Sequence, residues 1–125
     1  MSASLLAGVA VAGAIGAPAR YLLDGFISAR VDGAFPWGTL VVNVTGSLLL
    51  GLITGASLYH AFPDTSRIWL GTGFCGAYTT FSTFTVDTVL LLEDGAVGAA
   101  ARNVVASVLS CTVAAGVGLA VMAVV

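Results

Sequence analysis

Charged residues are scarce in this 125-residue chain, and lysine is absent. Only 8% of the residues are charged, the formal charge sums to −2, and 58% of the residues are hydrophobic, with a mean hydropathy of +1.06. Because a typical soluble domain carries about 25% charged residues, this composition excludes an ordinary water-soluble fold. The acidic balance also argues against nucleic acid as a partner.

Catalytic signatures are missing as well. The chain has no HExxH, CxxC or phosphate-loop motif and no embedded cluster of carboxylates or histidines, so we do not expect an enzyme. Cys75 and Cys111 lie in apolar stretches, where a free thiol packs as a small hydrophobe and says little about the redox compartment. A cleaved secretory signal ending at Ala17-Pro18-Ala19 is the weaker interpretation of the first apolar stretch, because no basic residue precedes it.

Long apolar segments occupy most of the chain. Four charge-free stretches cover residues 1–19, 33–63, 68–86 and 103–125. A helix needs roughly 20 apolar residues to cross a hydrocarbon core of about 30 Å, so each stretch supplies one crossing. We therefore expect an all-α membrane protein whose residues 1–125 form a single domain, with transmembrane helices at about 4–26, 35–59, 67–91 and 97–124.

Small residues recur at helical spacing in the first two expected helices. They are Gly8, Ala12 and Gly16 in the first helix and Gly51 and Gly55 in the second. Small residues four apart let backbones approach closely in lipid, where dispersion and weak polar contacts hold helices together. We therefore expect tight helix packing at these positions.

The signal for membrane orientation is nearly absent. Arg30 and Arg102 lie at one end of the expected bundle and Arg67 at the other. Orientation follows the excess of basic residues on the cytoplasmic side, and two against one is hardly an excess. The charge count therefore predicts a chain that inserts in either direction.

The third expected helix contains an unusual polar run at bilayer depth. Residues 71–85 hold three glycines, six threonines and serines, and Tyr78. Irregular backbone is tolerated at this depth where it is buried in protein or lines a wet cavity, so we expect a helix broken in mid-membrane that offers carbonyls or dipole ends to ions. The alternative is a packing helix whose hydroxyls bond back to the preceding turn.

Phe81 and Phe84 lie within this run and, three residues apart, project from one helix face. An aromatic ring is positive around its edge, so two ring edges can stabilise an anion more weakly than a full charge does. Beside the hydroxyls of Ser82 and Thr83, the pair predicts a pore that conducts an anion. Two phenylalanines alone would indicate core packing.

Other polar residues lie where contact with lipid is costly, so they are expected to face the protein interior or a water-filled cavity. Arg20 either draws anions into a vestibule, snorkels to the interface or pairs with Asp24 at i+4. Asn43 either donates two hydrogen bonds to an anion or joins helices. A further polar stripe along the fourth helix comprises Asn103, Ser107 and Cys111.

Three segments resemble the Fluc/CrcB family of fluoride channels. They are Gly13–Tyr21, Gly38–Gly46 and the highly specific Gly73–Phe84. The resemblance implies a fluoride-selective channel in the plasma or inner membrane of a prokaryote, which exports cytoplasmic fluoride passively down its electrochemical gradient. It also implies a dual-topology homodimer of antiparallel subunits with two pores, embedded in membrane lipid.

The resemblance further assigns roles to residues. It implies that Phe81, Phe84 and Asn43 line the fluoride path, with Asn103, Ser107 and Cys111 as a polar track. The backbone carbonyls of Gly76 and Thr79 are implied to bind one structural sodium ion on the dimer axis. The chain departs from the family at Ala77, where a second glycine is frequent, at Tyr78, where an apolar residue is common, and at Cys111, where a hydroxyl is usual. The role of Asp87 stays open.

Two other functions compete with this interpretation. Small proton-coupled multidrug exporters also have four helices and often insert in both directions, but they need an embedded carboxylate in the first helix. Here the carboxylate is Asp24, near the helix end and one turn after Arg20. A subunit that assembles without transporting anything is the third interpretation.

Overall fold

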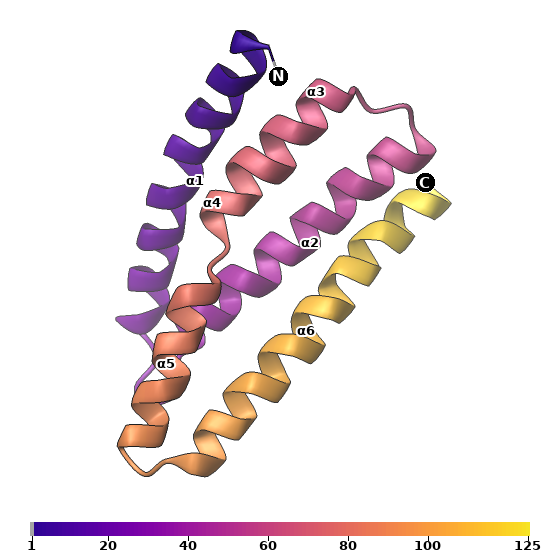
Figure 1. Ribbon diagram of the computed structural model, residues 1–125. Coiled ribbons are helices and arrows are strands. Elements are labelled where there is room, and N and C mark those ends of the chain that lie inside the picture. Colours follow the sequence, from indigo (N-terminus) through magenta and orange to yellow (C-terminus); the bar gives the residue numbers. More distant parts are fainter. Residues whose placement is uncertain (1) are drawn as a thin grey trace.

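The computed structural model describes residues 2–125, and its regular structure is entirely helical over that range. Three long helices are α1 (Ala3–Ser28), α2 (Trp37–Tyr59) and α6 (Val97–Val124). Between α2 and α6 the chain forms α3 (Asp64–Arg67), the π-helix η1 (Ile68–Cys75), α4 (Gly76–Tyr78) and α5 (Phe81–Glu93). Figure 1 shows α3 to α4 as one continuous upper half and α5 as a separate lower half.

The helix ends lie within three residues of the predicted ones, and local chemistry explains the differences. Helix α1 begins after Ser2, whose hydroxyl accepts the Leu5 amide at 3.3 Å. Helix α2 begins two residues later than predicted because Pro36 occupies its N-cap position. The third segment begins at Asp64 instead of residue 67, since a carboxylate in the first turn suits the helix dipole and Asp64 pairs with Arg67 at 3.3 Å.

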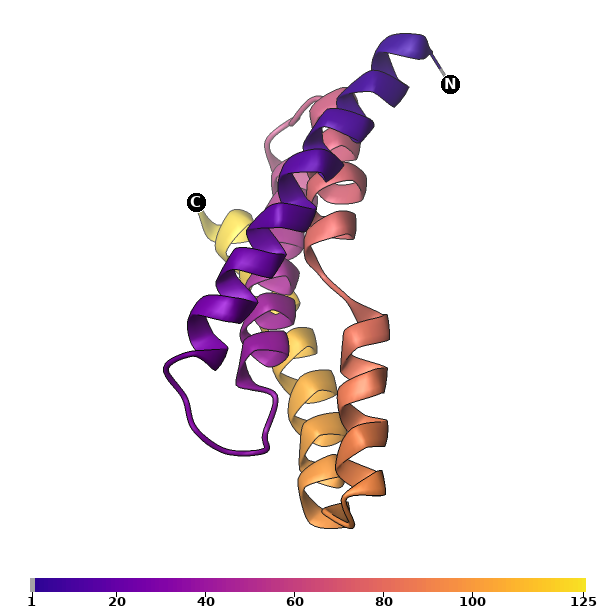
Figure 2. The ribbon, with the colours of Figure 1, turned by 90° about the vertical axis from the view of Figure 1, so that its left-hand side faces the viewer.

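The helices form a bundle in which α2 and α6 run side by side in the same direction and share its most extensive contact (Figure 1). Helix α1 crosses over α2 and packs against η1 and α4, as the view in Figure 2 shows. Helix α5 packs against the first half of α6. The two chain ends lie at the same end of the bundle.

Backbone contact at glycines holds α2 against α6. A methyl group on Gly51 would overlap the Ala115 carbonyl, and one on Gly118 would meet the Leu48 carbonyl and the Leu52 amide. On the other side of the bundle, Gly16 of α1 contacts the Phe74 carbonyl in the same way. The predicted close packing at small residues is therefore confirmed, and Gly118 extends it to α6.

Three helices are long and apolar enough to cross a membrane: α1, α2 and α6, with mean hydropathies of 1.5, 1.7 and 2.2. Large apolar side chains such as Leu22, Leu109 and Val113 are exposed on their outer faces. A soluble protein could not tolerate so many exposed apolar residues, whereas lipid solvates them. An all-α membrane fold is therefore confirmed. The third expected segment is divided between shorter helices.

The basic residues lie where the charge count predicts them. Arg102 at the start of α6 stacks over Phe35 in the loop before α2, with its guanidinium carbon 4.5 Å from the ring centroid. Arg30 stacks over Phe26 at 3.4 Å near the same loop. Arg67 lies at the opposite end, beside the turn that links α2 to α3.

Candidate ion pathway

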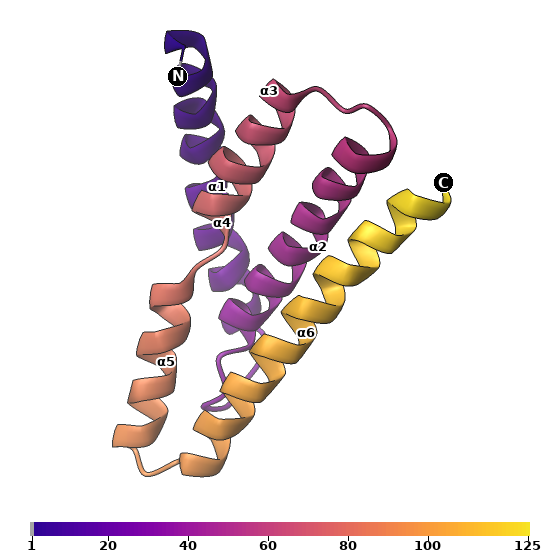
Figure 3. The ribbon, with the colours of Figure 1, turned by 45° about the vertical axis from the view of Figure 1, so that its right-hand side comes forward.

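The polar run of the third segment breaks its helix at two threonines. Thr79 and Thr80 are both extended, with ψ angles of 158° and 123°, and the helix resumes at Phe81. Thr80 caps the new helix because its hydroxyl accepts the Thr83 amide at 3.1 Å. Figure 3 shows α5 displaced sideways from the line of η1 and α4. The predicted break is therefore present, and it lies near the middle of the segment.

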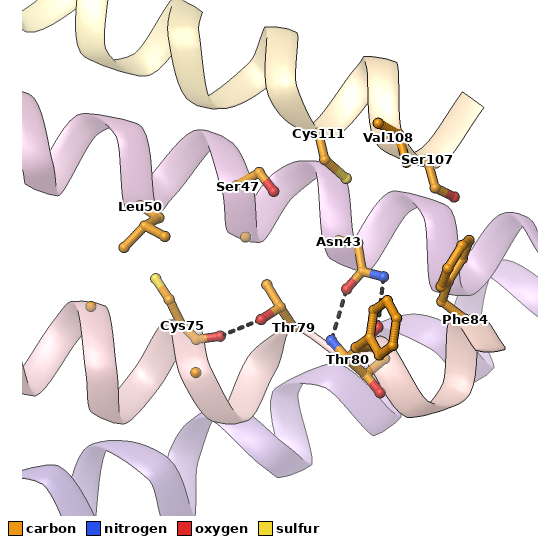
Figure 4. Close-up of a pocket in the computed structure, with 14 residues that line it drawn as sticks. Asn43, Ser47, Leu50, Cys75, Thr79, Thr80, Phe84, Ser107, Val108 and Cys111 are labelled. Atoms are coloured by element: carbon orange, nitrogen blue, oxygen red, sulfur yellow. Dashed lines mark hydrogen bonds between the residues drawn. The ribbon is translucent and has the colours of Figure 1, made fainter. Parts of the chain in front are cut away.

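Asn43 of α2 binds the break directly (Figure 4). Its Nδ2 donates to the Thr80 carbonyl at 2.9 Å, and its Oδ1 accepts the Thr80 amide at 2.8 Å. We call these two bonds the Asn43 clamp. They satisfy backbone groups that a broken helix leaves unpaired, where each unmet group costs about 1–3 kcal/mol. The clamp leaves one N–H of the Asn43 amide for another acceptor.

Several carbonyls at the break lack the amide partner that a continuous helix would give them. In a continuous helix the Gly76 carbonyl would accept the Thr80 amide, but that amide is donated to Asn43. The Thr79 carbonyl would accept the Thr83 amide, but that amide is donated to the Thr80 hydroxyl. The Ala77 and Tyr78 carbonyls likewise accept no backbone amide from the start of α5. Carbonyl oxygens suit a hard cation such as sodium, and two of these four residues, Gly76 and Thr79, are the ones that the resemblance assigns to sodium.

Tyr78, a departure from the family pattern, is buried and tied to α2. Its hydroxyl lies 2.8 Å from the Thr45 hydroxyl, and its ring stacks on Phe74 with centroids 5.5 Å apart. Gly46 lies beside it, where a methyl group would collide with Thr79 and meet the Tyr78 ring. The phenol therefore supplies a second link between α2 and the residues just before the break.

A cavity of about 360 Å³ opens next to the clamp, between the third segment, α2 and α6. We call it the phenylalanine cavity. Phe81 and Phe84 both line it, with ring centroids 5.7 Å apart and planes inclined at 45°. Asn43, Ser107 and Cys111 also line it, and Figure 4 shows Ser107 and Cys111 on the α6 side. The structure thus gathers five of the predicted pore residues around one cavity.

The remaining predicted pore residues lie elsewhere. Asn103 is buried and donates to the Thr88 hydroxyl at 3.0 Å, so it joins α6 to α5. Thr83 faces the other side of α5, and Ser82 is exposed and lines none of the three described cavities. Of the polar stripe on α6, only Ser107 and Cys111 line the phenylalanine cavity.

Two smaller cavities lie on the far side of the clamp. The arginine cavity, about 170 Å³, is lined by Arg20, Asp24, Thr80 and Thr83 among others. The adjoining acidic cavity, about 290 Å³, includes Asp24, Asp87 and Thr83 in its lining. Thr80 lines both the arginine and the phenylalanine cavity, so the clamped residue forms the wall between them.

The structure also gives the surroundings of two charged residues. Arg20 lines a cavity without forming an ion pair with Asp24; among residues 2–125 the only ion pair joins Arg67 to Asp64. Asp87 accepts a hydrogen bond of 2.7 Å from the Thr39 hydroxyl, which links α5 to α2. Because Thr39 is buried, this bond is partly shielded from water and holds the Asp87 carboxylate in place.

Comparison with known proteins decides the family. Residues 7–119 match the family described as "CrcB-like protein, Camphor Resistance (CrcB)". The chain is 50% identical over 111 residues to "Fluoride-specific ion channel FluC 1" of Streptomyces avermitilis, covering 88% of this chain and 86% of the relative. It is 49% identical over 112 residues to "Fluoride-specific ion channel FluC" of Geobacter sulfurreducens, covering 89% and 90% respectively. The chain belongs to the CrcB family.

Membership of the CrcB family agrees with the three apolar helices. The chain is therefore a multi-pass membrane protein of a prokaryote, and the predicted family and localisation are confirmed.

Some residues of this CrcB chain escaped sequence reasoning. Thr80 was one hydroxyl among six in the polar run, yet it caps α5 and holds both bonds of the Asn43 clamp. Thr39 and Thr45 lie in α2 with no distinguishing pattern around them, and their partners are 48 and 33 residues away. The spacing Thr80-x-x-Thr83 resembles a helix N-cap and was the one available signal.

Proposed function

We propose that this chain forms a fluoride-selective channel that lets cytoplasmic fluoride leave passively down its electrochemical gradient. The observation that carries the proposal is the similarity to relatives named fluoride-specific ion channels, which are 46–50% identical in sequence over 88–89% of this chain. Those names do not favour the alternative of a proton-coupled multidrug exporter. Transport by a passive channel requires no catalytic residues, in line with the expectation that the chain is not an enzyme.

The phenylalanine cavity suits the chemistry of the ion. Fluoride is strongly hydrated, so a narrow pore must replace its water with donors and still release it. The hydroxyl of Ser107, the thiol of Cys111 and the spare N–H of Asn43 are such donors. The tilted rings of Phe81 and Phe84 add positive edges without a full charge, which keeps binding weak enough for conduction.

The route we propose passes from the arginine cavity, past Thr80, into the phenylalanine cavity. Arg20 attracts the anion into the first cavity, where no carboxylate neutralises its charge in an ion pair. Thr80 and Asn43 then separate the two cavities. Thr83, which lines the arginine cavity, adds a hydroxyl beside this passage at the N-terminus of α5, where the helix dipole is positive.

We also propose that the third segment is a fourth crossing and that two antiparallel subunits form the working channel. Both chain ends lie at one end of the bundle, which requires an even number of crossings. Phe81 is 79% exposed in the single subunit although it lines the proposed pore, so a second copy is needed to enclose it. The balanced arginines allow both orientations in one membrane.

A structural sodium ion is part of the same proposal. The freed carbonyls of Gly76 and Thr79 supply negative potential at the end of α4. Gly76 is exposed in the single subunit, so an inverted copy can bring a matching pair of oxygens to it. When bound, the ion would supply positive charge that holds the two breaks together.

Fluoride efflux from liposomes tests the function. Purified protein is reconstituted in vesicles loaded with potassium fluoride, with potassium chloride as the matched control. Valinomycin is added so that potassium leaves with the anion and balances its charge, and released fluoride is followed with an electrode. We expect rapid fluoride release, little chloride release, and neither from protein-free vesicles. No fluoride release above the protein-free level would refute the channel and favour the assembly subunit.

A further inference from the structure

Asp24 occupies a distinctive place in the structure, because its side chain lines both the arginine cavity and the acidic cavity. The carboxylate is held there by the Ser28 hydroxyl, which donates to Oδ1 at 3.3 Å. It also lies against Gly38 of α2, where a methyl group would overlap Oδ1. Asp24 is thus a fixed negative charge on the side of the clamp where Arg20 lies.

The charged and titratable groups around these cavities are few. Helix α1 contributes Arg20 and Tyr21 besides Asp24, and α5 contributes Asp87. Helix α2 presents the uncharged Thr39 and Gly38. Asp87 receives a short hydrogen bond from Thr39, whereas Asp24 receives only the longer one from Ser28. Arg20 forms no ion pair with either carboxylate within the described part of the chain.

Opposite charges that line one cavity without forming an ion pair both act on a passing ion. The field of Arg20 raises the local concentration of anions, and the field of Asp24 lowers it. Neither group is neutralised by direct pairing, so the anion concentration depends on both. A pair with Asp24 was one of three roles that the sequence left open for Arg20, and the absence of that pair gives the carboxylate a separate effect.

We propose that the negative charge of Asp24 opposes the attraction of Arg20 and so limits the rate at which anions enter the pathway. The balance of the two charges then sets the fluoride conductance of this chain. This inference rests on the proposed channel function. Asp24 is not a ligand for fluoride; it changes the potential of the cavity through which fluoride arrives. Removal of its charge raises fluoride flux wherever entry is rate-limiting.

The test compares Asp24→Asn with Asp32→Asn in the liposome assay, at fluoride concentrations well below saturation. Asn keeps the size of the side chain against Gly38 and removes its charge. Asp32 is an exposed loop residue that lines none of the three cavities, so it controls for the loss of one carboxylate. We expect Asp24→Asn to raise flux about two- to fivefold at low ionic strength, and Asp32→Asn, whose neighbours Val31 and Gly33 line the acidic cavity, to raise it clearly less. Asp24→Glu, which keeps the charge, should stay near wild type.

Ionic strength separates an electrostatic effect from a change in packing. The Debye length falls from about 10 Å at 0.1 M to about 3 Å at 1 M, so added potassium gluconate should bring the Asp24→Asn and wild-type rates together. Arg20→Gln should change flux in the opposite direction, with the same sensitivity to salt. If wild type transports fluoride but Asp24→Asn has equal or lower flux, or a gain that salt does not reduce, the inference is overturned while the channel stands. If wild type transports nothing, the proposed function itself fails.

Discussion

Single side chains carry most of the chemistry proposed for this channel, and the aromatic pair is the clearest case. We predict that Phe81→Ile or Phe84→Ile reduces fluoride flux at least tenfold, about 1.4 kcal/mol in barrier height, because the ring edge is lost while an apolar filler stays. The measurement is liposome efflux, with dimer content checked by size-exclusion chromatography. Wild-type flux in both variants would remove the rings from the pathway.

The second prediction for a single side chain concerns Asn43, because the structure shows its two hydrogen bonds to Thr80. Asn43→Ala deletes both bonds of the clamp and leaves the Thr80 amide and carbonyl unpaired, at a cost of about 1–3 kcal/mol. Both flux and the unfolding temperature in detergent should therefore fall. Asn43→Asp keeps the acceptor for the Thr80 amide but loses the donor and adds a negative charge beside the anion path, so its flux should also fall.

Ser47→Ala is the matched control for that experiment. Ser47 lines the same cavity one turn further along α2, and its side chain has no hydrogen bond to the break. Its unfolding temperature should stay at the wild-type value. An unaltered unfolding temperature for Asn43→Ala would show that the clamp does not stabilise the fold.

At the scale of elements, the contact between α2 and α6 depends on the absence of side chains. We predict that Gly118→Ala lowers the free energy of unfolding by about 1–3 kcal/mol, because its methyl group meets the Leu48 carbonyl and the Leu52 amide. Gly116→Ala, two residues away on the same helix, meets nothing within 4 Å and serves as control. Thermal unfolding in detergent measures both, and equal stabilities would contradict the packing account.

The broken helix supplies the next prediction. If sodium binds the freed carbonyls of Gly76 and Thr79, its replacement by a large organic cation throughout purification should slow fluoride flux or loosen the dimer. Lithium and potassium series would show whether ion size matters. A high-resolution map without spherical density at these oxygens, together with unchanged flux in sodium-free buffer, would exclude the ion.

The whole molecule is the scale at which orientation is decided. Arg30 and Arg102 at one end oppose Arg67 at the other, so a few added charges should decide insertion. We predict that two or three lysines added to the loop before α2 force one orientation and abolish fluoride transport. Coexpression with a copy carrying lysines in the loop after α2 should restore transport, because the two copies are then mutually inverted.

Cysteine labelling from either side of the membrane measures the orientation of each copy in that experiment. Full transport by a single copy held in one orientation would refute antiparallel assembly. It would also require another explanation for how Phe81, which is largely exposed in the single subunit, becomes enclosed in the pore.

The amino-acid sequence by itself determined the membrane location, the helical segments and the position of the break. These follow from local properties: the length of charge-free stretches and a polar run in residues 71–85 that a lipid-facing helix does not tolerate. The three motifs also indicated the family without a structure, because each motif consists of residues that are close together in the chain. Side-chain roles were predicted only as alternatives.

Tertiary structure alone decided which polar groups meet. Asn43 had two possible roles, and only the structure shows that its amide binds the backbone of Thr80, 37 residues away, with one N–H left for another acceptor. Arg20 had three possible roles, and the structure removes one of them, because Arg20 forms no ion pair with Asp24 in the cavity that both residues line. Hydrogen bonds and fields depend on distances between helices, and those distances are set by backbone contacts such as Gly51 against Ala115, which no local pattern encodes.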